Sequence, residues 1–142
     1  MVDVNVWLAL THDGHEHHDA AVRWFDSLSS REAFFCRTTQ VAYLRLLTNQ
    51  RIAQASGVRP ATLTQAWAFY DALWADPRVD FLAEPADFEA AFRKMSSGPL
   101  ASTKVVADSY LAAFANQWHV GLATLDKGFV ARGGLEELIV IA

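Results

Sequence analysis

The chain has 142 residues, of which 52% are hydrophobic, so it is long enough to fold as one domain around a hydrophobic core. Its single cysteine, Cys36, excludes an internal disulfide, and its formal net charge of −4 argues against a broad basic surface for nucleic acid. It lacks a signal-peptide pattern and an apolar run of about 20 residues, so we expect one cytoplasmic domain over residues 1–142 with no membrane partner.

The first half of the chain predicts strand, helix, strand and helix. Residues 2–10 are apolar and β-branched, which favours a buried strand. Apolar residues recur at helical spacing over residues 16–28, and residues 33–36 resemble a second short strand. A helix should follow, capped by Thr38 or Thr39.

The second half continues this alternation. Thr62 or Thr64 should cap a helix whose apolar side carries Trp67, Tyr70 and Trp74, a stripe typical of a core or a dimer interface. The remaining predicted elements are a strand at 79–82, a short helix from Asp87, a helix over 105–115, and strands at 121–125 and 138–141. Strands alternating with helices indicate an α/β fold with a parallel sheet covered on both faces.

Three aspartates occupy positions that are unusual for surface residues. Asp3 lies in the first apolar run, Asp108 on the apolar face of a helix, and Asp126 directly after the strand at 121–125. A buried carboxylate without a partner is costly, and one cleft that held a Mg²⁺ or Mn²⁺ ion would explain all three. Such a site supports hydrolysis of a phosphodiester bond.

Each aspartate also has a purely structural interpretation. Asp3 could bind a backbone N–H at the end of a strand, and Asp108 could pair with Lys104 four residues earlier. Asp126 could cap a short helix at residues 128–131. For any one aspartate, the structural explanation is about as probable as the functional one. For all three together, a single shared site is the better explanation, because it accounts for three unusual positions at once.

A cluster of histidines near the N-terminus suggests a transition-metal site. Tetrahedral sites need ligands that surround one point, whereas this stretch spans a loop and the start of a helix. We therefore expect solvated loop histidines at His12, His15, His17 and His18.

Five segments together resemble the PIN-domain family, and within it the VapC-type ribonuclease toxins of bacterial toxin–antitoxin modules. They are DVNVWLAL at 3–10, HEHHDAAVRWFDSL at 15–28, FCRTTQVAYLRLLTNQRI at 35–52, KVVADSYLAAFA at 104–115 and ATLDKGF at 123–129. They cover nearly the whole chain, in order and at the family's spacing. The resemblance implies a three-layer α/β/α sandwich with a central, mainly parallel sheet of four to five strands.

The resemblance also implies an activity and its residues. The protein would be a Mg²⁺- or Mn²⁺-dependent endoribonuclease that cleaves RNA, forms a homodimer and is inhibited by a cognate VapB-like antitoxin. By position, Asp3, Asp108 and Asp126 would bind the metal and carry the catalysis. The possible supporting residues are Asn5, Gln40, Thr124, Lys104 and Arg45.

One departure from the family pattern concerns the second helix. Many members carry a glutamate three residues before an arginine there, whereas Ala42 stands three residues before Arg45. The missing carboxylate predicts weaker metal binding before RNA arrives, with Gln40 as a neutral substitute. A catalytically weakened binding module is therefore the alternative. An aspartyl-phosphate phosphatase is a poorer match, because it needs an aspartate where Asn5 stands.

Overall fold

Short parallel strands lie at the centre of the fold. The computed structural model describes residues 1–55, 58–99, 101–129 and 134–142. Within these ranges, β1 (Ala33–Phe35) pairs with β2 (Val79–Phe81), and β3 (Leu122–Thr124) pairs with β4 (Leu138–Val140). Both pairs are parallel, as the alternation of strands and helices predicts.

The N-terminal residues join the two strand pairs. Val2 forms a parallel bridge with Ala123 of β3, and its N–H donates to the carbonyl of Phe34 in β1 at 3.1 Å. The N–H of Asp3 donates to the carbonyl of Ala123 at 2.9 Å. The order across the centre is therefore β2, β1, the N-terminal residues, β3 and β4.

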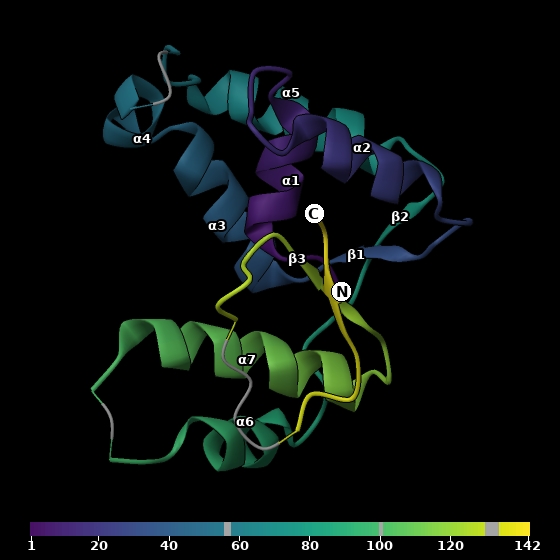
Figure 1. Cartoon of the computed structure of the whole chain (residues 1–142), viewed down its shortest axis with the longest axis vertical. Coiled ribbons are helices and arrows are strands. Elements are labelled where there is room, and N and C mark those ends of the chain that lie inside the picture. Colours follow the sequence, from purple (N-terminus) through teal and green to yellow (C-terminus); the bar gives the residue numbers. More distant parts are fainter. Residues whose placement is uncertain (56–57, 100, 130–133) are drawn as a thin grey trace.

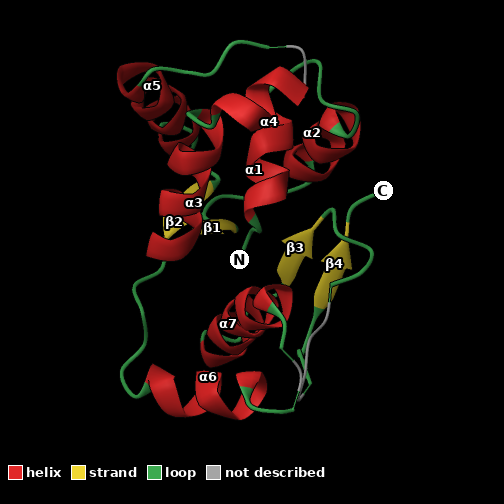
Figure 2. Ribbon diagram, turned by 90° about the vertical axis from the view of Figure 1, so that its left-hand side faces the viewer, coloured by secondary structure: helices red, strands yellow, loops and turns green. Residues whose placement is uncertain are grey.

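Helices cover this centre from two sides. They are α1 (Val4–Thr11), α2 (His18–Asp26), α3 (Arg37–Leu47), α4 (Gln50–Ala55), α5 (Leu63–Trp74), α6 (Phe88–Ser96) and α7 (Thr103–Gln117). Figures 1 and 2 show α1 to α5 on one side of the strands and α6 and α7 on the other. This is the three-layer α/β/α arrangement that the resemblance implies.

The predicted strand at residues 2–10 is wrong beyond its first residues. The chain leaves the sheet at Asp3 and forms α1, in which Val6, Trp7 and Ala9 are buried. The indole of Trp7 stacks on Phe35 of β1, with ring centroids 4.0 Å apart. Because α1 packs against the sheet and the neighbouring helices, its sequence is mostly apolar, with Asn5 and Thr11 as its polar residues. A short, mostly apolar run cannot distinguish a buried strand from a buried helix.

The other predicted elements are confirmed, with small differences at their ends. The helix after β1 begins earlier than predicted: Cys36 holds the N-cap position, and the hydroxyl of Thr39 accepts a hydrogen bond from the Cys36 N–H at 3.0 Å. Thr62 caps α5 as predicted, with its side chain accepting from the N–H of Gln65. The helix α4 was not predicted.

The aromatic stripe of α5 is only partly buried. Tyr70 is 8% exposed, whereas Trp67 and Trp74 are 46% and 45% exposed. The two tryptophans therefore lie at the surface, not in the core. No helix within the described ranges has both the length and the apolar character needed to cross a bilayer.

The helix α7 presents Asp108 to the interior, as its spacing predicts. Val105, Leu111, Ala112 and Ala115 are buried on this helix, and Asp108 is buried with them. The adjacent helix α6 packs against α7 through a group of aromatic rings, which are Phe88, Phe92, Tyr110 and Phe114. This packing fixes the position of α7 and hence of Asp108.

Candidate active site

Asp3 stands where the N-terminal residues leave the sheet and α1 begins. It occupies the N-cap position of that helix. Its Oδ2 atom accepts two hydrogen bonds, from Asn5 Nδ2 at 2.9 Å and from Thr124 Oγ1 at 2.7 Å. The carboxylate is therefore held in one orientation by a residue of α1 and a residue of β3.

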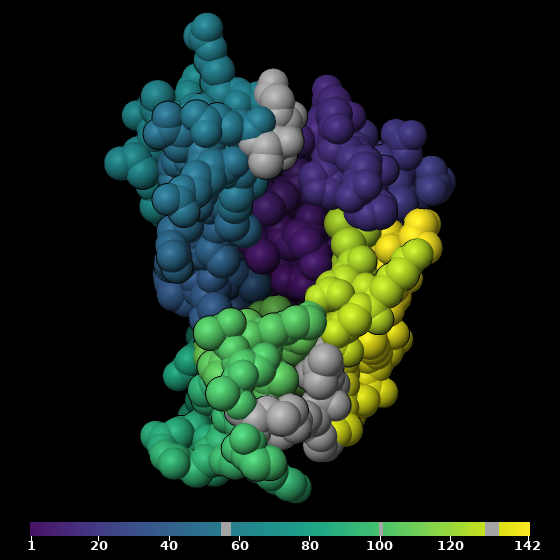
Figure 3. Space-filling model, turned by 60° about the vertical axis from the view of Figure 1, so that its left-hand side comes forward, coloured from purple at the N-terminus to yellow at the C-terminus, as the bar shows by residue number. Residues whose placement is uncertain are grey.

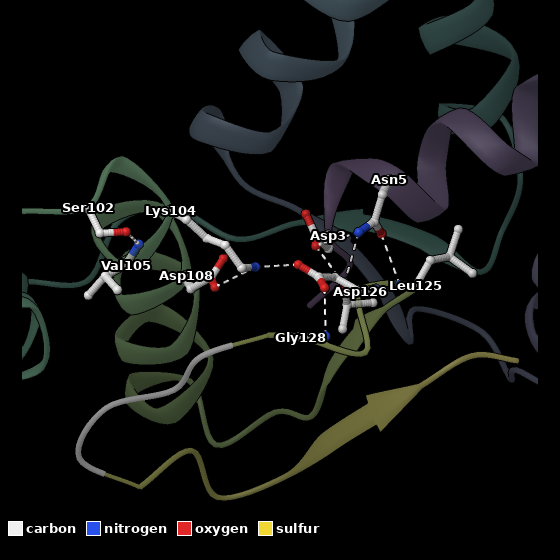
Figure 4. A network of polar contacts seen from close by, with 10 residues as sticks. Asp3, Asn5, Ser102, Lys104, Val105, Asp108, Leu125, Asp126 and Gly128 are labelled. Atoms are coloured by element: carbon white, nitrogen blue, oxygen red, sulfur yellow. Dashed lines mark hydrogen bonds and ion pairs between the residues drawn. The ribbon is translucent and has the colours of Figure 1, made fainter. Parts of the chain in front are cut away.

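Thr124 connects this carboxylate to the loop that follows β3. The residue is fully buried, and its hydroxyl also accepts from Asn5 Nδ2 at 3.0 Å and from the N–H of Asp126 at 3.1 Å. The carbonyl oxygen of the Asn5 side chain accepts from the N–H of Leu125 at 3.1 Å. These bonds fix the start of α1 to the end of β3 (Figure 4).

Lys104 links the other two aspartates. Its ammonium lies 3.0 Å from Asp108 Oδ2, one helical turn along α7, and also forms an ion pair with Asp126 Oδ2. The second oxygen of Asp126 accepts from the N–H of Gly128 at 2.7 Å. Figure 4 shows the ammonium between the two carboxylates, with Asp3 above Asp126 in this view.

The three carboxylates are close enough to affect one another electrostatically. Burial raises the pKa of Asp3 above its usual value, and the charges of Asp108 and Asp126 raise it further, against the opposing effect of the Thr124 hydrogen bond. The hydrogen bond from Lys104, followed by that from Gly128, lowers the pKa of Asp126. The structure thus brings together the three aspartates that the sequence predicts to converge.

Three of the supporting residues also lie in this cluster, namely Asn5, Thr124 and Lys104. Gln40 is buried, but its carboxamide accepts a hydrogen bond from Arg37 and contacts Tyr70. Arg45 is exposed in the last turn of α3. We expected Gln40 to substitute for the missing glutamate. Its contacts do not favour that role, because its carboxamide bonds with residues of α3 and α5.

The structural interpretation of Asp108 is realised together with the convergence of the aspartates. Asp108 pairs with Lys104 as expected. The helix proposed at 128–131 falls partly outside the described residues, although Asp126 does accept the Gly128 N–H. The bond that sequence reasoning missed is the one between Lys104 and Asp126, because it depends on where the chain turns after β3.

The histidines near the N-terminus are partly buried instead of fully solvated. The ring of His18 forms a hydrogen bond with the carbonyl of Ala9 at 2.7 Å, and His15 Nδ1 accepts from the N–H of His17 at 3.1 Å. Burial lowers the pKa of His15. No group of three metal-binding side chains is formed by them among the residues that the structure describes.

The surface is hollowed around the N-terminal residues. Figure 3 shows these residues (purple) at the bottom of a recess, with residues of α3 and α4 (blue), the start of α7 (green) and the segment after β3 (yellow-green) around it. An open depression beside it is lined by Ala101, Ser102, Thr103, Lys104 and Val106.

The donors in this cluster fit a hard divalent cation. Carboxylate, hydroxyl and carboxamide oxygens are the ligands that Mg²⁺ and Mn²⁺ prefer. A cation, the Lys104 ammonium, already lies between Asp108 and Asp126. Within the described ranges, no three carboxylates surround a common point as they stand, so an ion would have to draw them closer together.

The raised pKa of Asp3 predicts a specific effect on stability. Folding favours the protonated form, so the protein should lose stability as the pH rises from the ordinary aspartate pKa of 3.8 through the raised value. Asp3→Asn keeps an oxygen that can accept both hydrogen bonds and removes the charge. We expect the metal-free variant to be more stable than the wild type at neutral pH, by about 1 kcal/mol.

Urea unfolding in the presence of EDTA at several pH values measures this difference. Asp71→Asn serves as the control, because Asp71 is exposed on α5. The gain of Asp3→Asn should disappear at a pH below 3.8. A gain that is equally large at that pH would show that the charge of Asp3 is not its cause.

The sequence is similar to a known family and to known proteins. The PIN-domain family model matches residues 1–135. Ribonuclease VapC41 of Mycobacterium tuberculosis is 41% identical over 138 residues, which are 96% of this chain and 94% of that protein. Ribonuclease VapC25 of the same organism is 30% identical over 131 residues, which are 91% of this chain and 89% of the relative.

Two solved structures share the fold. The crystal structure of M. tuberculosis VapC20, described as a toxin that cleaves the sarcin–ricin loop, matches with a TM-score of 0.60 and 18% identity, over 90% of each chain. The structure of FitAB bound to the IR36 DNA fragment matches with a TM-score of 0.53 and 20% identity, over 90% of this chain and 85% of that one.

Proposed function

The chain belongs to the PIN-domain family, among its VapC-type members, and on that premise we propose that it is a toxin that hydrolyses phosphodiester bonds in RNA with a bound Mg²⁺ or Mn²⁺ ion. Its relatives VapC41 and VapC25 are named as ribonucleases. The proposal goes beyond this likeness in naming the metal and in assigning the chemistry to Asp3, Asp108 and Asp126.

The observation that carries this assignment is the convergence of the three aspartates. They come from the start of α1, from α7 and from the loop after β3. The charges of Asp108 and Asp126 both raise the pKa of Asp3. Bringing three carboxylates together costs free energy of folding, and neutral side chains at these positions would avoid that cost. Such a cost is expected where a site must attract a cation.

The residues of this chain would divide the work as follows. Asp3, Asp108 and Asp126 would hold the ion, and Thr124 and Asn5 would keep the carboxylate of Asp3 turned toward it through their hydrogen bonds. When bound, the divalent ion lowers the pKa of water at the site and stabilises negative charge on the scissile phosphate. One of the three carboxylates, if it holds the ion through a water molecule, could accept the proton of the attacking water.

A cognate VapB-like antitoxin and a homodimer are retained as proposals for the partners. The exposed tryptophans of α5, Trp67 and Trp74, offer an aromatic surface of the kind enriched at protein interfaces. Co-expression with the product of a short neighbouring reading frame, followed by co-purification, tests the first partner. Sedimentation of the purified chain and of a Trp67→Ala, Trp74→Ala variant tests the second.

A catalytically weakened binding module is the second candidate. It is favoured by Ala42, which supplies no carboxylate where many family members have a glutamate. In that case the protein would bind RNA or an antitoxin through the same recess without cutting RNA at an appreciable rate.

One assay distinguishes these two functions. Purified protein is incubated with labelled RNA and with DNA of the same sequence, in Mg²⁺, in Mn²⁺ and in EDTA. The proposed enzyme cleaves the RNA only when the metal is present. Binding of RNA without cleavage in either metal would favour the binding module, and cleavage that persists in EDTA would contradict the role of the ion.

A further inference from the structure

The ammonium of Lys104 occupies a place in the site that neither the family comparison nor the proposed chemistry explains. It lies between two carboxylates from different parts of the fold, Asp108 on α7 and Asp126 after β3. These are two of the three residues assigned to the metal. A single side chain therefore already neutralises part of the charge that the ion would neutralise.

From this arrangement we propose that Lys104 is an internal counter-cation that competes with the divalent ion for Asp108 and Asp126. The inference rests on the proposed metal site. Without the ion, the ammonium balances part of the repulsion among the three aspartates. When the ion binds, the two carboxylates turn toward it, and Lys104 leaves them.

The surroundings of Lys104 make this exchange easy. Its side chain is 46% exposed, and the side chain of Asp126 is 37% exposed, so water can replace the ion pair between them. Exposed ion pairs are weak, and a lysine ammonium on its flexible stem can move without changing the backbone. By contrast, the side chain of Asp108 is only 11% exposed, so this carboxylate gains most from having a cation beside it at all times.

The position of Lys104 also gives the displaced ammonium a place to go. Lys104 lines the open depression at the start of α7, beside the recess. Once released, the ammonium faces the solvent side of the site, where the phosphate of a bound substrate would lie. Substrate would then favour metal binding, because its negative charge attracts the ammonium away from the two carboxylates.

The missing carboxylate on α3 makes this competition more important in this chain. Three aspartates and one lysine leave the site with a formal charge of −2, whereas a fourth carboxylate would leave −3. With less negative charge, the site attracts a divalent ion more weakly, and one competing ammonium has a larger relative effect. We therefore expect Lys104 to set the metal affinity of the substrate-free protein.

Binding of Mn²⁺ to the purified protein tests the proposal without any assay of activity. Titration followed by the electron paramagnetic resonance signal of free Mn²⁺ gives a dissociation constant for each variant. Lys104→Gln should bind Mn²⁺ about five- to tenfold more tightly than the wild type. Lys104→Arg, which keeps the charge, should bind it as weakly as the wild type.

Lys127→Gln is the matched control. It removes the same charge from the residue next to Asp126, yet Lys127 is exposed and makes no ion pair within the described part of the chain. We expect it to change the Mn²⁺ affinity by less than about twofold. Equal tightening by both variants would show a general charge effect and would overturn the specific role of Lys104.

Thermal unfolding provides an independent measurement of the same competition. In EDTA, Lys104→Gln should melt below the wild type, because three aspartates then repel one another without a counter-cation. Saturating Mn²⁺ should raise its melting temperature by more than it raises that of the wild type. The proposal is overturned if Lys104→Gln binds Mn²⁺ no more tightly than the wild type and its melting temperature rises no more than that of the wild type when Mn²⁺ is added.

The outcomes separate this inference from the proposed function. If wild type and Lys104→Gln bind Mn²⁺ equally and the wild type cleaves RNA, only the role of Lys104 fails. If no variant binds Mn²⁺ and none cleaves RNA, both fail. Tighter binding by Lys104→Gln alone supports the competition, even where the wild type binds too weakly to measure.

Discussion

Asp108→Asn should lower the rate of RNA cleavage by about a thousandfold, which corresponds to roughly 4 kcal/mol of lost transition-state stabilisation. Asp108 is the more buried of the two carboxylates that contact Lys104. Because it lies on the packed helix α7, no neighbouring carboxylate can move into its place. The amide has the same shape but no charge with which to hold a divalent ion.

The control for this variant is Glu89→Gln on α6. Glu89 also pairs with a cation one helical turn away, Arg93, but it is exposed and lies on α6, which carries none of the residues assigned to the site. The substitution makes the same chemical change and breaks the same kind of ion pair. We expect it to leave cleavage within about twofold of the wild type. Folded Asp108→Asn protein that retains a tenth of the wild-type rate would contradict the role of Asp108.

Thr124→Val should have the second largest effect, a loss of about 10- to 100-fold in the cleavage rate. Valine matches threonine in shape but has no hydroxyl to donate to Asp3 or to accept from Asn5. Asp3 would then lose the shorter of its two hydrogen bonds from these side chains and turn more freely. The buried polar groups left unpaired should also cost about 1–3 kcal/mol in the free energy of unfolding.

Thr124→Ser separates the hydroxyl from the rest of the side chain. Serine keeps the hydrogen bonds and loses only a buried methyl group, which costs about 1 kcal/mol of stability. Its cleavage rate should stay within about threefold of the wild type. Equal rates for the valine and serine variants, compared at a temperature where both are folded, would show that the hydroxyl does not position Asp3.

The sequence predicts part of this site well because some of its residues follow a clear pattern. The apolar stripe of α7 places Asp108 toward the interior, and the burial of that stripe confirms it. Asp126 follows a short apolar strand, so its position at the carboxyl end of β3 could also be predicted. These two predictions depend only on local periodicity.

Asp3 shows why other parts could not be predicted. Its apolar surroundings correctly indicate burial, but they favour a strand, whereas the chain forms α1 from the next residue onward. The helix is packed between β1 and the neighbouring helices, with Trp7 stacked on Phe35, so Asn5 and Thr11 are its only polar residues and no regular polar stripe marks it as a helix. Only the tertiary packing distinguishes the two conformations.

The bonds between distant segments are the least predictable feature. Lys104 and Asp126 lie 22 residues apart, and their contact depends on the turn after β3. Gln40 is a second example, because its position near the start of α3 predicts a neutral ligand but gives no sign that its carboxamide accepts a hydrogen bond from Arg37. Neither outcome leaves a signal in the spacing of the sequence.

The most direct test of the central claim is to return Mn²⁺ to metal-depleted protein while RNA cleavage is measured. The wild type is compared with a variant in which Asp3, Asp108 and Asp126 are all replaced by asparagine. We expect cleavage by the wild type to be absent in EDTA and to rise to a plateau as Mn²⁺ is added, while the folded variant stays inactive at every concentration. Cleavage by the variant at the wild-type rate, or by the wild type without metal, would contradict a metal-dependent site formed by these three aspartates.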